Sequence, residues 1–437
     1  MYFSRLFTRT SLVALLVGLI ASCGGGSDAP QVHSLPLLGE APPGQSLPVL
    51  SEGPPVQSLP VLSVAPSQVA NSNVLPVLVD SGPAGTGYNV NRLYTSVTIC
   101  ESGSTTRCQT IDHVLVDTGS TGLRLLAPEL RSDLRLNRLT GASGFLLLNC
   151  VQFVDNTYAW GTVATADILL GDKRAASVPL QIVADAAAGL PASACAVGGT
   201  AITTTADLGA KGIIGLGLFK DDCGSRCAIT TNNGTYYTCT DANCTSSTGT
   251  SVRTDNQVKN PVPLFGQDNN GVLVDLPAVS LSGARRLDGS LIFGINTLPN
   301  NQLSSASVIT TNTRGYVTTE YGNRLFTKSF FDTGSNGLYF DDTTITPCST
   351  GFYCPASLTP LSATVLGANG VPVSVNFSID DARILFGVNT VLPTLSGNIL
   401  QPDMFDWGLP FFYGRRVFFG IEGQFIQGQP NVPFYAF

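Results

Sequence analysis

Two short stretches of the sequence carry the same four residues, Asp-Thr-Gly-Ser, at residues 117–120 and 332–335. Each follows a hydrophobic run, and each is followed one residue later by Gly-Leu. A hydrophobic strand that ends in Asp-Thr-Gly brings a carboxyl group to a tight turn, because Gly allows close approach of the backbone. A buried carboxylate needs hydrogen-bond partners, and the backbone N–H groups and the Ser hydroxyl of the turn can provide them.

Two such turns predict a pair of carboxyl groups that act together. If a pseudo-twofold axis brings Asp117 and Asp332 face to face, both groups cannot ionise easily, and they share one proton. One carboxylate can then act as a general base on a water molecule while the other group donates a proton to a carbonyl oxygen. This chemistry requires neither a cofactor nor a metal nor a nucleophilic side chain.

The elements around these turns are predicted to be short β-strands. Helical periodicity is scarce, and residues 127–139 are the best candidate for a short helix. We therefore expect an all-β fold of two comparable halves, each with one Asp-Thr-Gly-Ser turn. The predicted strands are aliphatic or β-branched runs bounded by turn residues, the first beginning at residue 74 and the others at residues 92–100, 110–117, 144–155, 165–171, 178–185, 271–283, 289–295, 315–322, 371–379 and 415–426.

The composition points to a protein outside the cytoplasm. Charged residues make up 12% of the 437 residues, whereas Gly and Pro number 46 and 27. Such a mixture favours a β-rich chain with many turns. The formal net charge is −7 and the chain has no Lys/Arg cluster, which argues against a nucleic-acid partner.

The N-terminus resembles a bacterial lipoprotein signal. The apolar run of residues 11–20 follows two arginines and is too short to span a bilayer. Residues 20–23, Ile-Ala-Ser-Cys, resemble a lipobox, which implies removal of residues 1–22 and lipidation of Cys23. The residue after Cys23 is Gly rather than Asp, which implies an outer-membrane lipoprotein of the cell envelope, with the face of the membrane left open. An ordinary signal peptide cut nearby is the alternative.

Residues 23–73 are predicted to be a Pro-rich linker. The sequence SLPLL at residue 34 is followed by SLPVL at residues 46 and 58, with Gly, Pro, Gln and Glu between the copies. Such a segment cannot bury a core, and we expect an extended spacer from the membrane.

The cysteines predict disulfides. Without Cys23 an even number remains, and an exported chain with ten cysteines is expected to form up to five bridges. The spacing favours pairs 100–108, 223–227, 239–244 and 348–354, with 150–195 closing a longer loop, although spacing does not fix connectivity. A zinc site is disfavoured because the chain has only two His residues. The candidates are Cys100, Cys108, Cys150, Cys195, Cys223, Cys227, Cys239, Cys244, Cys348 and Cys354.

Residues 221–260 differ from the rest in being rich in Thr, Asn and Gly with four of these cysteines. We expect either an ordered, disulfide-pinned insertion or an excursion between the two halves.

Taken together, the paired motifs and their companions resemble the pepsin-type aspartic proteases. In that family each lobe also contributes a hydrophobic-hydrophobic-Gly element that passes behind the catalytic loop. Residues 211–219 resemble the first-lobe version and residues 407–423 the second, while residues 289–303 resemble the strand and loop that open the second lobe. The likeness extends over residues 74–437. The pattern also resembles an uncharacterised family of bacterial lipoproteins with two such motifs.

The resemblance implies a pepsin-like double β-barrel, with a cleft between two pseudo-twofold related lobes at residues 74–265 and 266–437. It implies a monomeric aspartic endopeptidase of the bacterial envelope that holds a polypeptide substrate in this cleft. Asp117 and Asp332 would be catalytic, by the shared-proton mechanism established for pepsin.

The other motif residues would support the pair of aspartates, Asp117 and Asp332, which we call the dyad. In the family, the Thr hydroxyls lock the two loops together, and the Ser hydroxyls bond the outer carboxylate oxygens. The alternative for the two threonines is a generic turn residue, and the alternative for the two serines is an exposed turn hydroxyl. The supporting residues are Thr118, Gly119, Ser120, Thr333, Gly334 and Ser335.

The sequence departs from the family at the flap that covers the substrate, which usually carries Tyr-Gly. Here Trp160 precedes Gly161, and Tyr158 lies on the same strand face as Trp160. An indole N–H can donate a hydrogen bond but cannot accept one. Ordinary packing of a β-hairpin accounts for these residues equally well. The second lobe also has Gly-Leu-Pro at residues 408–410 where the family has Gly-Asp.

The sequence also allows a different catalytic site and a different function. His113 could pair with Asp117 in a Ser-His-Asp site, but four residues along a strand span about 13 Å. We therefore expect His113 to be structural. A non-catalytic pepsin-fold lipoprotein that binds a peptide, a protein partner or a polysaccharide is the alternative function.

Overall fold

The computed structural model describes residues 72–348, 351–387, 389–399 and 401–437, and most of its regular structure is β-strand. The all-β fold class is therefore confirmed. The predicted signal peptide at residues 1–22, the predicted lipidation site Cys23 and residues 23–71 of the predicted linker lie outside the described residues. None of the described helices is both long and apolar enough to cross a membrane.

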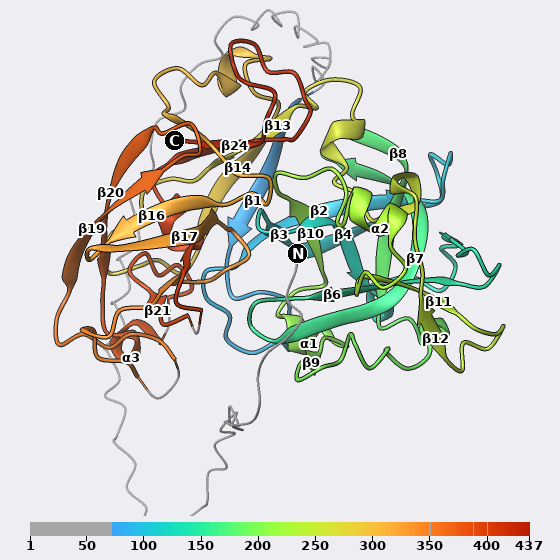
Figure 1. Cartoon of the computed structure of the whole chain (residues 1–437). Coiled ribbons are helices and arrows are strands. Elements are labelled where there is room, and N and C mark those ends of the chain that lie inside the picture. The colour runs from blue at the N-terminus through green and yellow to red at the C-terminus, as the bar shows by residue number, and fades with distance from the viewer. Residues whose placement is uncertain (1–71, 349–350, 388, 400) are drawn as a thin grey trace, which may run out of the picture. The chain divides into compact units, whose positions relative to one another are not determined.

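Six strands from the first half close into a barrel, drawn mainly in cyan and green in Figure 1. β3 pairs in parallel with β10, β4 pairs in parallel with β8, and the other four pairings are antiparallel. Aliphatic side chains such as Val97, Val116 and Ile214 fill its interior. In order around the barrel, the strands are β2 (Leu93–Cys100), β3 (Cys108–Asp117), β10 (Gly212–Leu216), β4 (Thr121–Leu126), β8 (Lys173–Val183) and β7 (Thr157–Leu170).

Seven strands from the second half form a half-barrel with the same pairing pattern around its motif. β17 pairs in parallel with β22, and β22 pairs antiparallel with β18, as β3, β10 and β4 do in the first half. The internal repeat of the sequence is thus also a repeat of topology. The strands, in order, are β20 (Pro372–Ile379), β19 (Thr359–Leu366), β16 (Val317–Tyr321), β17 (Arg324–Phe331), β22 (Met404–Trp407), β18 (Leu338–Phe340) and β21 (Ser396–Gly397).

A third group of strands joins the two halves. All its pairings are antiparallel, and β1 pairs with β14 of the second half as well as with β2 of the barrel. The predicted strand at residue 74 is therefore present, but it belongs to this shared sheet. In order, its strands are β1 (Val74–Val79), β14 (Leu287–Phe293), β13 (Gly271–Asp275), β23 (Arg416–Gly420), β24 (Phe434–Ala436) and β15 (Val308–Thr310).

The remaining elements are short. The strands are β5 (Asn137–Arg138), β6 (Leu147–Gln152), β9 (Thr200–Ala201), β11 (Tyr236–Cys239) and β12 (Ser247–Gly249). The α-helices are α1 (Thr205–Leu208), α2 (Ser225–Ile229) and α3 (Ala382–Leu385). The 3₁₀ turns are η1 (Ala127–Glu129), η2 (Ala186–Ala188), η3 (Thr254–Asn256), η4 (Val262–Leu264), η5 (Pro299–Asn301) and η6 (Leu409–Phe412).

The helix predicted at residues 127–139 is wrong. Only η1 forms there, followed by a turn and β5. The side chain of Gln109 on β3 donates to the carbonyl of Glu129 and accepts from the N–H of Arg131. These bonds replace the helical ones, so a tertiary contact overrides the local preference. The predicted strand at residues 271–283 is also shorter than expected, because β13 ends at Asp275, before Pro277.

Five disulfides join the pairs that the spacing favours: Cys100–Cys108, Cys150–Cys195, Cys223–Cys227, Cys239–Cys244 and Cys348–Cys354. Residues 221–260 contain two of these bridges together with α2, β11 and β12, and β11 pairs with β6 beside the barrel. This segment is therefore an ordered insertion of the first half rather than an excursion between the halves.

A buried polar network ties the insertion to the barrel. Arg124 on β4 is 2% exposed and donates to Asn149 Oδ1 at 2.6 Å, Gln181 Oε1 at 2.7 Å and Asp222 Oδ2 at 3.2 Å. Burial raises the pKa of Asp222, and the charge of Arg124 opposes that rise. Tyr236 of β11 donates to the other oxygen of Asp222 at 2.6 Å.

Candidate active site

The two motif aspartates stand at the ends of equivalent strands. Asp117 is the last residue of β3, Asp332 follows β17, and both are nearly buried, at 6% and 8% exposure. The strand that pairs in parallel with each one brings a glycine beside it. A Cβ atom on Gly215 would lie 2.5 Å from the backbone N of Thr121, and one on Gly408 would lie 2.0 Å from a backbone oxygen. The predicted hydrophobic-hydrophobic-Gly elements therefore need glycine because the motif loops pass too close for any side chain.

The structure brings the two carboxyl groups together. The N–H of Gly119 donates to Asp117 Oδ1 at 2.8 Å and also to Asp332 Oδ1 at 3.1 Å. Since one N–H reaches both oxygens, their separation cannot exceed the sum of these distances, which is below the roughly 7 Å at which we expect two titrations to uncouple.

The two glycines make this approach possible. A Cβ atom on Gly119 would lie 2.7 Å from Asp332 Cγ, and one on Gly334 would lie 2.8 Å from Asp117 Cγ. Each loop thus presents its glycine to the carboxyl group of the other loop. Gly334 also donates its N–H to Asp332 Oδ1 at 2.7 Å, as Gly119 does to Asp117.

The surroundings favour one shared proton. Burial raises the pKa of Asp117 well above its ordinary value, and the charge of Asp332 raises it further. The Ser120 hydroxyl and a hydrogen bond from Gly119 lower the pKa of Asp117 by less. Asp117 therefore retains a proton at a pH where an isolated aspartic acid has lost it.

The two threonines bind the loops to each other reciprocally. Thr118 Oγ1 accepts from the N–H of Thr333 at 3.0 Å and donates to the carbonyl of Phe331 at 3.3 Å. Thr333 Oγ1 accepts from the N–H of Thr118 at 3.2 Å and donates to the carbonyl of Val116 at 2.7 Å. These bonds follow a pseudo-twofold relation, and they form the hydroxyl network that the resemblance implies for these residues.

The two serines differ. Ser335 Oγ donates to Asp332 Oδ2 at 2.8 Å, which is the bond expected for both serines. Ser120 Oγ is buried and makes no hydrogen bond of standard geometry. The second-half carboxyl group therefore has a serine hydrogen bond of standard geometry, whereas the Ser120 hydroxyl is close enough to lower the pKa of Asp117 without forming one.

A third acidic residue, Asp406, lies beside the dyad and was missed by the sequence reasoning. It is in β22 and is 1% exposed, and its Oδ1 has no hydrogen-bond partner. Burial and then the charge of Asp332 raise the pKa of Asp406 well above its ordinary value. A lone acidic residue in the apolar run of residues 404–412 was the available signal.

The predicted flap residues pack within the first half. Tyr158 and Trp160 are both 7% exposed, and the indole N–H of Trp160 donates to the carbonyl of Ala188 at 3.3 Å. The Trp160 ring meets Tyr237 edge-on at 5.3 Å. A Cβ atom on Gly161 would lie 1.8 Å from a backbone oxygen of β8, so this glycine is required by the pairing of β7 with β8. These contacts are those of hairpin packing, and a flap role stays a prediction.

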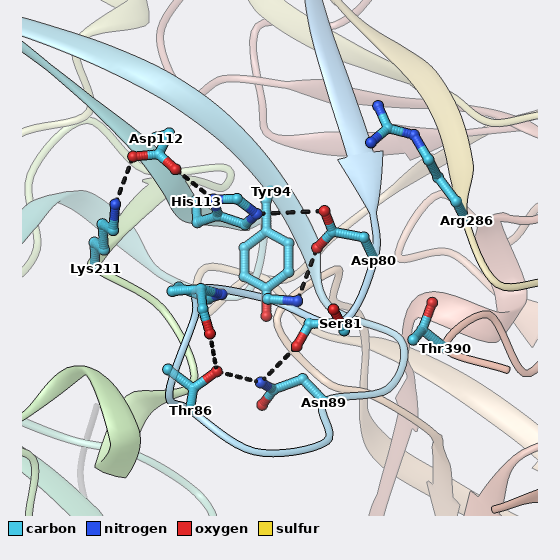
Figure 2. A network of polar contacts seen from close by, with 12 residues as sticks. Asp80, Ser81, Thr86, Asn89, Tyr94, Asp112, His113, Lys211, Arg286 and Thr390 are labelled. Carbon is cyan, nitrogen blue, oxygen red and sulfur yellow. Dashed lines mark hydrogen bonds and ion pairs between the residues drawn. The ribbon is translucent and has the colours of Figure 1, made fainter. Parts of the chain in front are cut away.

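His113 belongs to a separate polar network, shown in Figure 2. Its Nδ1 lies 2.6 Å from Asp112 and its Nε2 lies 3.3 Å from Asp80, at the end of β1, while Lys211 pairs with Asp112 at 2.6 Å. The ring also contacts Tyr94 edge-on at 5.2 Å. His113 has a positive φ of 51° at a bulge in β3, and these partners account for it as a structural residue.

A possible metal-ligand cluster occurs away from the dyad. Among the described residues, Cys348, Cys354 and Asp381 lie close enough together to share an ion. The two cysteines form a disulfide, so they offer no thiolate.

Residues 69–437 match the model of a family described as "Protein of unknown function (DUF3443)". No curated protein matches the sequence.

Proposed function

The chain belongs to the DUF3443 family, whose description names no activity, and we propose from the geometry of its site that it is an aspartic endopeptidase. The observation that carries the proposal is the single N–H of Gly119 shared by Asp117 and Asp332. It holds two nearly buried carboxyl groups within coupling distance, where they retain a proton between them.

The coupled pair can hydrolyse a peptide bond without other reagents. The ionised carboxylate takes a proton from a water molecule, and the water oxygen attacks the carbonyl carbon. The protonated carboxyl group donates its proton to the carbonyl oxygen, which gives a neutral tetrahedral intermediate. Collapse of this intermediate returns a proton to the leaving nitrogen and breaks the C–N bond.

Other hydrolytic mechanisms have fewer candidates in the described part of the chain. All ten described cysteines are in disulfides, and His113 is held by Asp112 and Asp80. The acid–base pair is therefore the chemistry that the site offers.

The arrangement of strands supports a pepsin-like double β-barrel as the finer description of the fold. Both halves use a parallel strand and an antiparallel strand to hold the motif loop, and both contribute to the joining sheet. In a fold of this type, a polypeptide substrate lies extended between the lobes, where the paired carboxyl groups reach one peptide bond.

The test compares the wild-type protein with Asp117→Asn and Asp332→Asn on a denatured protein substrate from acid to neutral pH, with pepstatin as the inhibitor probe. Each Asn variant keeps the side-chain shape, and we expect cleavage to fall by about 10³-fold or more. Asp112→Asn is the matched control, because Asp112 is an exposed carboxylate on the same strand, β3. If the wild type cuts nothing at any pH, or if both Asn variants cut as well as the control, the proposal fails.

The second candidate function is a non-catalytic pepsin-fold protein that binds a peptide, a protein partner or a polysaccharide. The observation that favours it is the commitment of Trp160 to hairpin packing. This function predicts an inactive wild type whose unfolding temperature rises with a peptide or a polysaccharide, by an amount that grows with concentration.

We propose that the protein acts at the outer membrane as a lipoprotein anchored through Cys23. Metabolic labelling with a clickable fatty acid tests this part independently. The wild type should incorporate the label and Cys23→Ser should not, and equal labelling of both would contradict the anchor.

A further inference from the structure

Asp406 occupies a position in β22 that aims its side chain away from the aromatic core. Its neighbours Phe405 and Trp407 stack on each other at 4.3 Å within that core. Successive side chains of a strand point to opposite faces, so Asp406 faces the other side of the sheet. There it lies between Phe330 of β17 and Tyr339 of β18 in the strand pairing.

The surroundings of Asp406 oppose ionisation. The charged groups that act on it are Asp332 and Asp117, and both are acidic. Tyr339 faces it from β18, and burial raises the pKa of Tyr339. In the described part of the chain no Lys or Arg forms an ion pair with Asp406. A buried carboxylate without a cation or a full set of donors is strongly disfavoured, whereas the neutral acid is not.

Ser335 connects Asp406 to the dyad. Its single hydroxyl hydrogen is donated to Asp332 Oδ2 at 2.8 Å, so its oxygen is free to accept. Ser335 lies beside the end of β22, where its carbonyl accepts from the N–H of Leu409 at 2.8 Å. Burial and the charge of Asp332 raise the pKa of Asp406, and the Ser335 hydroxyl lowers that pKa by less. A protonated Asp406 can donate to this oxygen, and each bond in such a chain strengthens the next.

We propose that Asp406 is a neutral carboxylic acid that donates its hydrogen to Ser335 and, through Ser335, holds Asp332 as the ionised member of the dyad. The inference rests on the proposed function, because it assigns roles within the same site. Asp332 is then the general base on the water molecule, and Asp117 is the general acid that holds the shared proton.

The first half lacks this support, which makes the dyad asymmetric. Ile213 of β10 lies two residues before Gly215, as Asp406 of β22 lies two residues before Gly408, which directly follows that strand. An apolar side chain therefore lies at the equivalent place in the first half, and it offers no proton to a serine there. The asymmetry is encoded in one residue of each strand.

The activity test uses Asp406→Leu, which keeps the branched shape without a donor, and Asp406→Asn, which keeps a donor in the form of an amide N–H. We expect the Leu variant to lose about tenfold in kcat, with little change in KM, because one hydrogen bond to a charged group is weakened. The rise in kcat on the acid side of its pH profile, called the acid limb here, should shift to higher pH by as much as about one pH unit. The reason is that Asp332 then loses its proton less easily. The Asn variant should recover most of the lost kcat and keep the wild-type acid limb.

Ser335→Ala provides the test of the connection. If Asp406 acts through Ser335, the double variant Ser335→Ala/Asp406→Leu should be no slower than Ser335→Ala alone. Additive losses would contradict a path through Ser335. Equal rates and pH profiles for wild type, Leu and Asn variants would reduce Asp406 to a packing residue and overturn the proposal.

The protonation state is measured without relying on activity. In an NMR titration of the protein labelled with ¹³C-aspartate, the carboxyl signal of Asp406 is assigned by its absence from the spectrum of Asp406→Asn. Its chemical shift should remain that of a protonated carboxyl group through neutral pH. If this signal titrates like that of an ordinary carboxylate, Asp406 is ionised and the proposal is overturned. The same conclusion follows if the acid limb of the Asn variant shifts to lower pH than that of the wild type. A wild type without peptidase activity contradicts the proposed function alone, since this titration still decides the state of Asp406.

Discussion

Replacing Thr118 or Thr333 by valine should loosen the two active-site loops while keeping the shape of the side chain. The hydroxyl of Thr118 bonds the N–H of Thr333 and the carbonyl of Phe331, and the hydroxyl of Thr333 makes the reciprocal pair. Both threonines are buried, so water does not replace the lost partner without moving the loops. Each substitution therefore leaves one backbone N–H and one carbonyl group unsatisfied.

The magnitude follows from these unsatisfied groups. A buried donor or acceptor without a partner costs about 1–3 kcal/mol, and we expect each valine variant to lose about 2 kcal/mol in the free energy of unfolding. The double variant should lose about 3 kcal/mol rather than 4, because the first substitution already parts the loops. Thr110→Val is the matched control: its hydroxyl bonds Thr98 between β2 and β3 at the surface, and we expect a change within about 0.5 kcal/mol.

The assay combines urea unfolding, followed by the fluorescence of the two tryptophans, with the rate of peptide hydrolysis. Trp160 lies in the first half and Trp407 in the second, so both halves are monitored. Loss of the reciprocal bonds displaces the carboxyl groups, and a misplacement of about 1 Å should lower kcat by about 10²-fold. If both valine variants unfold and cleave like the Thr110 variant, the loops are held by packing alone and the reasoning is wrong.

Three further predictions concern burial, charge and crosslinking. Arg124→Met should lower the free energy of unfolding by about 3–5 kcal/mol, because it leaves Asp222 buried without its cation. In urea unfolding, the double variant Arg124→Met/Asp222→Asn should recover part of this loss. A double variant less stable than the single one would contradict the reasoning. The raised pKa of Asp117 means that the folded state holds a proton that the unfolded chain releases above about pH 4, so this contribution to stability is present below that pH and is lost as pH rises. The free energy of unfolding of Asp117→Asn, measured relative to that of the wild type, should therefore rise by up to about 1.4 kcal/mol per pH unit above pH 4. A difference between the two proteins that does not change with pH would contradict the raised pKa. The double variant Cys150→Ala/Cys195→Ala opens a loop with a sequence separation of 45 and should lose about 4 kcal/mol, whereas a loss no larger than that of an exposed side-chain change would show that the bridge does not constrain the unfolded chain.

Much of the site was predictable because its residues repeat. Two copies of one turn predicted both Asp117 and Asp332, and a strand ending in Asp-Thr-Gly is a local feature that the chain carries wherever it folds. The pairs of cysteines were predictable for a similar reason, since four of the five bridges close loops of only a few residues. The helix expected at residues 127–139 failed because Gln109, from a distant strand, took its backbone hydrogen bonds.

The sequence by itself determined the all-β class, the two equivalent halves and the two carboxyl groups, because strand periodicity, turn residues and a repeated motif are local properties of the chain. Only the tertiary structure decided how those groups are used. Asp406 meets the dyad because β22 pairs with β17, and Trp160 faces Tyr237 because β6, β7 and β11 pack together. The acidity of a carboxyl group depends on burial and on the charges within a few ångströms, and these are set by strands that lie far apart in the sequence.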